Sequence, residues 1–138
     1  MLVEADGIPV GLAVAGANCP DCKLAAETLA SIPIERPPPT AKKPQGLCVD
    51  KAYVGDEVAD LAEAFHFTLH IPAKGKTAQQ QKRKARSKAR RWVVERTHSW
   101  MNRFRGILIR WSKKPENYTA LLHMAFAFII YERMGLLG

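Results

Sequence analysis

The sequence predicts an α/β fold in a single domain, residues 1–138, whose two halves differ in character. Three observations support this prediction. Strand-like apolar segments alternate with segments of helical periodicity. A proline-rich stretch over residues 33–45 separates two of these segments. Residues 1–73 carry five Lys/Arg and ten Asp/Glu, whereas residues 74–138 carry sixteen and three. We therefore divide the chain into an α/β half, residues 1–73, and a basic helical half, residues 74–138.

Composition excludes several classes of protein. A chain that is 47% hydrophobic and 25% charged is typical of folded rather than disordered proteins. The longest nearly apolar run, 121–131, is shorter than the roughly 20 residues that cross a bilayer. No secretory signal opens the chain, and three cysteines do not indicate a disulfide scaffold. We expect a cytoplasmic protein with no membrane partner.

The α/β half is predicted to contain three strands and two helices. Branched apolar residues predict strands over 8–15 and 46–50, and an alternating pattern predicts a third over 67–71. Apolar spacing predicts helices over 22–30 and 57–65. Five prolines make 33–45 an exposed, extended loop. The alternating order predicts that the strands share one sheet.

The basic half is predicted to be helical after a polar hinge at 74–81. A long helix is expected from about Lys82 to about Leu108, and a last helix over 117–134 that stops at Gly135. The last helix is apolar on nearly every side, which predicts a buried core helix. A rotation of about 100° per residue places one apolar face of the long helix toward the core. That face consists of Trp92, Val93, Trp100, Phe104, Ile107 and Leu108, and we also expect Trp111, Tyr118 and Phe126 in the core, with contact to a nucleic acid as the alternative for Trp111.

The basic residues are concentrated in one short segment. Lys82 to Arg91 contains seven Lys/Arg in ten residues, and there is no acid between Glu63 and Glu95. Such asymmetry favours a polyanionic partner, most simply nucleic acid. The alternative is a solvated basic helix.

Two carboxylates stand out against this background. Asp50 ends a predicted buried strand, at the edge where α/β sheets bind ligands, or else it is a helix-capping residue. Glu95 is a lone acid on the polar side of the long helix, or else the salt-bridge partner of Arg91 one turn earlier. Together they predict a Mg²⁺ or Mn²⁺ site, because these ions prefer carboxylate oxygens and act on phosphodiesters.

Cys19 and Cys22 form a competing motif. A C-x-x-C that follows a strand and opens a helix is where a thioredoxin-like redox pair would lie. A zinc site would need Cys48 or a histidine in addition. Neither chemistry gives a role to the basic half, and two incidental thiols are the simpler interpretation.

Several ordered blocks of the chain resemble the DDE transposases of bacterial insertion sequences, in the fourth/fifth insertion-sequence family grouping. The resemblance is carried by residues 91–105, RWVVERTHSWMNRFR, preceded in order by Gly7-Ile-Pro-Val10, Gly16-Ala-Asn18 with Asp21 and Lys23, and 47–53. The segment 115–118, Pro-Glu-Asn-Tyr, and the apolar helix after it resemble the family's end.

The resemblance implies a ribonuclease-H-like fold with C-terminal helices, Mg²⁺ or Mn²⁺ as cofactor, and transposition as function. Asp50 takes the place of the family's second acid, Glu95 that of the third, and Arg91 that of the arginine four residues before it. The sequence departs from the family at Lys88, where a tyrosine is expected, and at Asn102, where a basic residue is expected.

The family's first aspartate lies upstream of the Gly7 block, so we expect a fold that is incomplete at its N-terminus. The resemblance implies metal-dependent DNA cleavage and strand transfer by the complete enzyme; the alternative is a non-catalytic DNA-binding or regulatory remnant. Implied partners are transposon ends and target DNA in the bacterial nucleoid, an upstream reading-frame product or full-length transposase, and an oligomer when active. Predicted DNA contacts are Lys51, Arg86, Lys88, Arg90, Arg91, Arg96 and Arg103.

Overall fold

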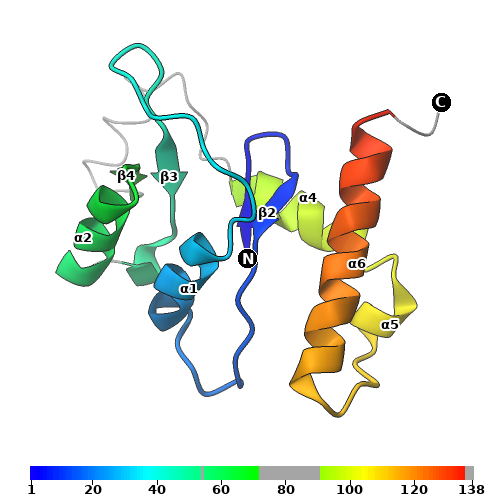
Figure 1. Cartoon of the computed structure of the whole chain (residues 1–138). Helices are drawn as coiled ribbons and strands as arrows, with labels where there is room; N and C mark the ends of the chain where they lie inside the picture. Colours follow the sequence, from blue (N-terminus) through cyan, green and yellow to red (C-terminus); the bar gives the residue numbers. More distant parts are fainter. Residues whose placement is uncertain (54, 72–90, 136–138) are drawn as a thin grey trace.

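The computed structural model describes residues 1–53, 55–71 and 91–135, and these form a mixed α/β structure (Figure 1). Strand β1 (Leu2–Val3) pairs antiparallel with β2 (Pro9–Gly11), and β3 (Gly46–Cys48) pairs in parallel with β4 (Thr68–His70). The α/β class is confirmed. The prediction that the strands share one sheet is wrong for the described residues, which form two separate two-stranded sheets.

The first predicted strand, 8–15, is shorter than expected. It ends at Gly11 because the next amide, that of Leu12, donates to the Ser31 hydroxyl at 2.8 Å instead of to a strand. Leu12 and Val14 then pack against the helical core described below. The apolar residues beyond Gly11 are therefore used for helix contacts and not for extending a sheet.

The β3–β4 pair packs with helices in a small core of its own. The chain enters it through a 3₁₀ helix, η1 (Asp21–Leu24), and α1 (Ala25–Ala30), and continues through α2 (Asp56–Ala64) between the two strands. Leu29, Leu47 and Ala62 are its buried residues, from α1, β3 and α2 respectively. The predicted helices and the two predicted strands of this region are confirmed, with shorter strands.

Three helices make up the C-terminal part: α4 (Arg91–Met101), α5 (Arg105–Leu108) and α6 (Pro115–Arg133). The predicted single helix to Leu108 is wrong, because α4 ends at Met101 and Phe104 is in an extended conformation before α5. Its first part, residues 82–90, lies outside the described residues. The last helix begins with Pro115 and ends before Gly135, whose φ of 67° fits the predicted stop.

The helical core is narrower than the sequence predicts. It consists of Trp100, Met101, Ile107, Leu122, Ala125, Phe126 and Ile129, with Tyr118 partly buried against it. Trp92, Leu108 and Trp111, all predicted to be core, are 50%, 60% and 74% exposed. Among the described residues, α4 and α5 contact α6, and the buried side chains of α6 lie on one face of the helix. Its other face exposes Leu121, Met124, Phe128 and Tyr131, and Met134 just after the helix is exposed as well.

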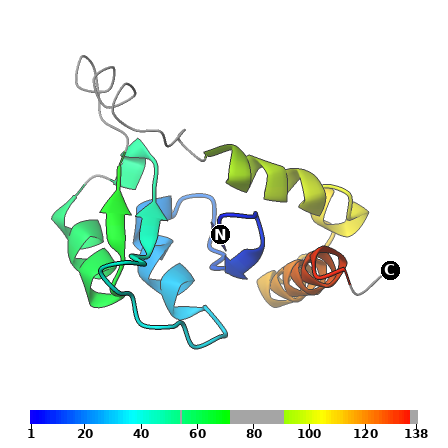
Figure 2. The same ribbon diagram turned by 90° about the horizontal axis from the view of Figure 1, so that it is seen from above.

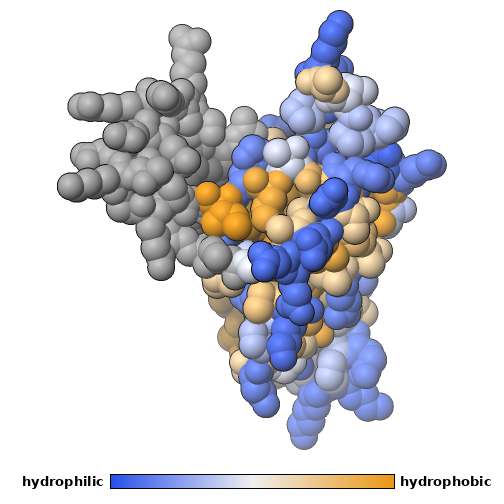
Figure 3. All heavy atoms as spheres, turned by 90° about the vertical axis from the view of Figure 1, so that its left-hand side faces the viewer, coloured by the Kyte–Doolittle hydropathy of each residue, from blue (hydrophilic) through white to orange (hydrophobic). Residues whose placement is uncertain are grey.

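The β1–β2 hairpin lies between the two packed regions. Figures 1 and 2 both show β3, β4 and α2 on one side of it and α6 on the other. The hairpin contacts both, since β2 touches α1 and β1 touches α4. The space-filling view from the β3–β4 side shows hydrophilic residues around the edges of this face and apolar residues near its middle (Figure 3).

Candidate functional site

Asp50 lies two residues beyond the end of β3 and is exposed. Its Oδ1 accepts a hydrogen bond from the Ala52 amide at 2.8 Å, at the start of the 3₁₀ helix η2 (Lys51–Tyr53). Because β3 and β4 are parallel, Asp50 is placed at the carboxyl end of a parallel pair, where α/β sheets bind ligands. One carboxylate oxygen thus caps the turn that follows, as the alternative interpretation expects, and the ligand-binding role of Asp50 stays a prediction.

A second aspartate shares the surroundings of Asp50. The pKa of the Tyr53 phenol is raised by burial first, and then by the negative charges of Asp21 and Asp50 and by Cys22. The two carboxylates therefore act on one hydroxyl, although they are distant in the sequence. Sequence reasoning did not connect Asp21 with Tyr53 or Asp50, because the two segments are distant in the sequence.

Glu95 is exposed on α4. Val93 and Thr97, two residues before and two residues after Glu95, lie on the opposite face of the helix. They are 3% and 0% exposed. The helix thus holds Glu95 in solvent while its opposite face is packed. The alternative pairing with Arg91 stays a prediction, since the Arg91 side chain lies outside the described residues.

The joining of Asp50 and Glu95 at one metal site also stays a prediction. In the described part of the chain, no three His, Cys, Asp or Glu side chains gather as a metal cluster. The two carboxylates are accessible, as a metal and a phosphate require, and neither of them lines the two cavities described next.

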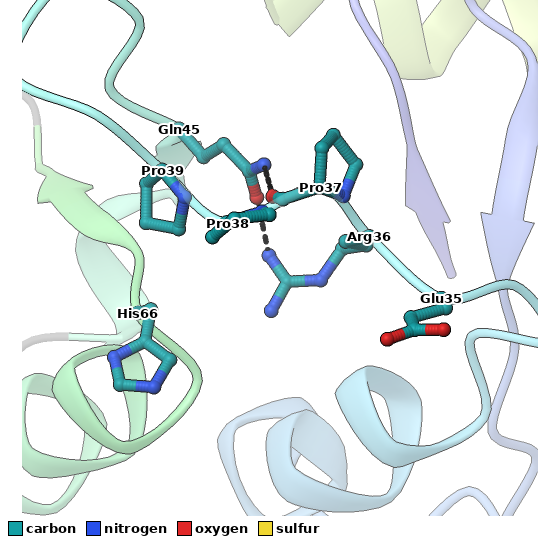
Figure 4. Close-up of a pocket in the computed structure, with 7 residues that line it drawn as sticks. All are labelled: Glu35, Arg36, Pro37, Pro38, Pro39, Gln45 and His66. Atoms are coloured by element: carbon teal, nitrogen blue, oxygen red, sulfur yellow. Dashed lines mark hydrogen bonds between the residues drawn. The ribbon is translucent and has the colours of Figure 1, made fainter.

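The first cavity, of about 330 Å³, lies along the proline-rich loop (Figure 4). Arg36 donates to Gln45 Oε1 and to the Phe65 carbonyl, each at 2.6 Å, and its guanidinium lies 4.0 Å from the centre of the Phe67 ring. Gln45 in turn donates to the Pro37 carbonyl at 2.7 Å. Arg36 therefore fastens the loop to the end of α2, and the expectation of a merely solvated loop is wrong at this residue.

The second cavity, of about 300 Å³, lies between the N-terminal segment and the helices. Most of its lining is apolar, and it has two polar side chains besides Tyr118: His98 of α4, and Asn102 just after that helix. The pKa of His98 is lowered by burial and, to a smaller extent, by the positive charge of the N-terminal amine. A neutral imidazole is therefore favoured on this side of α4.

The predicted DNA contacts fall into three groups. Arg86, Lys88 and Arg90 lie outside the described residues, and the side chains of Lys51 and Arg91 do as well. Arg103 is exposed in the turn after α4. Arg96 is half-buried, and its guanidinium donates to the Asp6 carbonyl and lies between Trp92 and Trp100. Sequence periodicity could not detect this internal use of an arginine.

The remaining motif, the C-x-x-C, contains free thiols. Cys19 and Cys22 are half-buried, and Cys48 is exposed. The redox pair stays an untested alternative to two incidental thiols, and no third His, Cys, Asp or Glu side chain of the described residues joins these cysteines as a metal cluster. Among the described helices, none combines the length and the apolar character that crossing a membrane requires.

Comparisons with known proteins give a family match and a curated relative. A family described as "Transposase DDE domain" matches residues 47–132, a stretch that includes Asp50 and Glu95. The chain is 36% identical over 44 residues to a Burkholderia cepacia protein named "Putative transposase for insertion sequence element IS402". That alignment covers 32% of this chain and 21% of the relative, so the match spans about a fifth of that protein. No solved structure matches the chain. Since the family match covers more than half of its residues, the chain belongs to the transposase DDE domain family.

Proposed function

We propose that this chain contributes Asp50 and Glu95 to a divalent-metal site that cleaves and joins DNA at the ends of an insertion sequence. The observation that carries the proposal is the position of Asp50 at the carboxyl end of the parallel strand β3, inside the family match. Glu95 lies in the same match, on the exposed face of α4.

The donor chemistry of these two residues fits Mg²⁺ or Mn²⁺. Both ions take carboxylate oxygens, and both side chains are exposed. Asp50 Oδ1 accepts the Ala52 amide, which orients the carboxyl group and leaves its second oxygen for a ligand. Two carboxylates are few for a two-metal site, so the family's first aspartate would come from a further segment, in the same chain or in a partner.

The same segment would also complete the sheet. Each described sheet has two strands, so each leaves a strand edge for extension. We propose that β1–β2 and β3–β4 are parts of one ribonuclease-H-like sheet, joined by a strand that carries the first aspartate. This would place the third carboxylate beside Asp50.

In this proposal the chain's own residues have two roles, metal ligation and binding of the DNA backbone. When bound, divalent ions would polarise the phosphodiester and stabilise the attacking and leaving oxygens. Asp50 and Glu95 would hold them. Arg103 and the basic residues that precede α4 would bind the DNA backbone through their positive charge, which positions the DNA without selecting a base sequence.

Titration with Mn²⁺ tests the metal site directly. We expect Mn²⁺ to broaden the NMR signals of residues around Asp50 and around Glu95 at the same concentrations. Either D50N or E95Q should weaken the broadening at both places. The matched controls D60N on α2 and E116Q on α6 remove exposed acids elsewhere and should leave the titration unchanged. Broadening at only one of the two sites, or equal losses in the controls, would contradict a shared site.

A second candidate is a non-catalytic DNA-binding or regulatory remnant. The observation that favours it is the charge of residues 74–138, with sixteen Lys/Arg against three Asp/Glu. DNA binding without Mg²⁺-dependent nicking, even after the upstream segment is added, would support this candidate. Nicking of insertion-sequence ends that D50N and E95Q both abolish would support the catalytic proposal.

A further inference from the structure

Helix α4 is fastened to the β1–β2 turn immediately after Glu95. Thr97 is fully buried, at 0% exposure, and its hydroxyl donates to the Gly7 carbonyl at 2.6 Å. The same Oγ1 lies 3.2 Å from the Val93 carbonyl, one helical turn earlier. A buried hydroxyl that joins two elements in this way fixes how the helix is rotated against the turn.

Arg96 makes the second contact between the helix and the turn. Its Nη2 donates to the Asp6 carbonyl, next to the carbonyl that Thr97 uses. The guanidinium carbon lies 4.7 Å from the centre of the Trp92 ring and 5.0 Å from that of Trp100, at four residues before and four after it. These two stacking contacts hold the guanidinium against the turn.

The turn itself is shaped to accept both side chains. Its backbone is closed by hydrogen bonds from the Glu4 amide to the Ile8 carbonyl, 3.0 Å, and from the Gly7 amide to the Glu4 carbonyl, 2.9 Å. Gly7 has a φ of +83°, and a Cβ there would lie 2.9 Å from Arg96 Nη2 and 3.2 Å from Thr97 Oγ1. Only glycine combines this conformation with so close an approach.

We infer that the turn at residues 4–8, with Arg96 and Thr97, is a clamp that positions Glu95; this rests on the proposed function of Glu95. A helix held at two successive residues can neither rotate nor slide without breaking a contact. One residue of slippage would turn Glu95 by about 100° and move it about 1.5 Å along the axis. Arg96 and Thr97 are thus positioning residues, and Arg96 acts through the fold and not as a DNA contact.

A spin-label distance measurement tests the clamp without metal or DNA. One label is placed on the native Cys48, which is exposed in β3 near Asp50, and one on S99C, an exposed position of α4. Cys19 and Cys22 are replaced by serine so that only these two positions are labelled. The distance distribution between the labels then reports where α4 lies relative to the end of β3.

The variant T97V removes the hydroxyl and keeps the shape of the side chain, and T97S restores the hydroxyl. The matched control is T119V, because the Thr119 hydroxyl also donates to a carbonyl one turn earlier, that of Pro115 at 3.0 Å, and has no hydrogen bond to a second element among the described residues. We expect the distribution to broaden about twofold in T97V and to stay narrow in T97S and T119V. An unchanged distribution in T97V, or equal broadening in T119V, would overturn the clamp.

The variant R96K keeps the test decisive if T97V does not fold. Lysine retains the charge and loses the planar group that stacks between the tryptophans. The clamp predicts a broadened distribution in R96K, and a distribution as narrow as that of the parent would overturn it. Broadening in these variants together with a failed Mn²⁺ titration would contradict the proposed function and leave the clamp standing.

Discussion

At the scale of single residues, the contacts of Gly7 in the fold explain why this position of a short sequence block is a glycine. It is buried, it has a positive φ, and it faces two side chains of α4 that lie about ninety positions later in the chain. The resemblance to the transposase family included this glycine, but the sequence around it does not indicate which residues it contacts. Its packing against Arg96 and Thr97 supplies the physical reason for glycine at this position.

We expect G7A to lower the free energy of unfolding by about 1–3 kcal/mol, because it combines a strained backbone with a steric clash. Urea denaturation followed by circular dichroism measures the change. The control G106A lies in α5, where the nearest atom to a new Cβ is 3.9 Å away. That variant should be neutral or slightly stabilising, because alanine favours a helix. Equal destabilisation by both would contradict the role given to Gly7.

The lowered pKa of His98 predicts that the free energy of unfolding depends on pH. Burial, and to a smaller extent the N-terminal charge, lower its pKa in the folded state below 6.5. The unfolded chain therefore binds the proton more readily, so this contribution to stability is present above about pH 6.5 and is lost as the pH falls. We expect H98Q to lose less stability than the parent between pH 7 and pH 5 in urea titrations. The control H123Q changes an exposed histidine of α6 and should follow the parent.

At the scale of elements, α6 shows that a helix with an apolar sequence need not be buried on every side. The helix carries no charged residue between Glu116 and Glu132, which led to the expectation of a fully buried helix. Among the described residues, the buried side chains of α6 lie on one face, and α4 and α5 contact this helix. Phe104 and Phe128 stack edge to face at 5.6 Å, and Arg133 lies 3.8 Å above the Trp100 ring, so contacts with neighbouring segments continue at the margin of this face.

The two faces of α6 should respond differently to substitution. Phe126 is 7% exposed within the helical core, so F126A should cost about 3–5 kcal/mol of unfolding free energy through lost burial and a cavity. Met124 is 70% exposed, and M124A should change the same quantity by less than about 0.5 kcal/mol. Chemical denaturation of both variants measures the difference. Similar losses at the two positions would show that the exposed face is covered in solution.

At the scale of the whole molecule, charge is divided unevenly along the chain. The acidic residues lie mainly in the part that forms β1–β4, α1 and α2, and the basic residues mainly in the part that contains α4, α5 and α6. Such a division along the sequence favours binding of a polyanion through residues 74–138. It also makes the strength of that binding depend on salt, because each phosphate that is neutralised releases counterions.

We expect DNA binding to weaken steeply with salt, and R86A/K88A/R90A to reduce the slope of log K against log salt by up to about 3. Fluorescence anisotropy with labelled duplex DNA at several salt concentrations measures this slope. The control K23A/K42A/K43A removes the same charge from the acidic half and should leave the slope unchanged. Equal effects of the two triple variants would indicate attraction by net charge alone.

The sequence by itself determined the α/β class, most element positions, the stop at Gly135 and the transposase family. These features depend on local patterns: the period of apolar residues, the conformational limits of glycine and proline, and ordered motifs along the chain. Asp50 at a strand end and Glu95 on a polar helix face belong to the same category, because each placement needs only its own segment.

Only the tertiary structure decided where the strands pair, which face of α6 is covered, and what Arg36 and Arg96 contact. Arg96 looks like any other base in a basic segment, yet it bonds the Asp6 carbonyl and stacks on two tryptophans. The prediction for Trp92 failed for a related reason, since an aromatic residue on an apolar stripe is buried only if another element covers it. Local periodicity assigns a residue to one side of its own helix; contacts between residues distant in sequence determine what lies against that side.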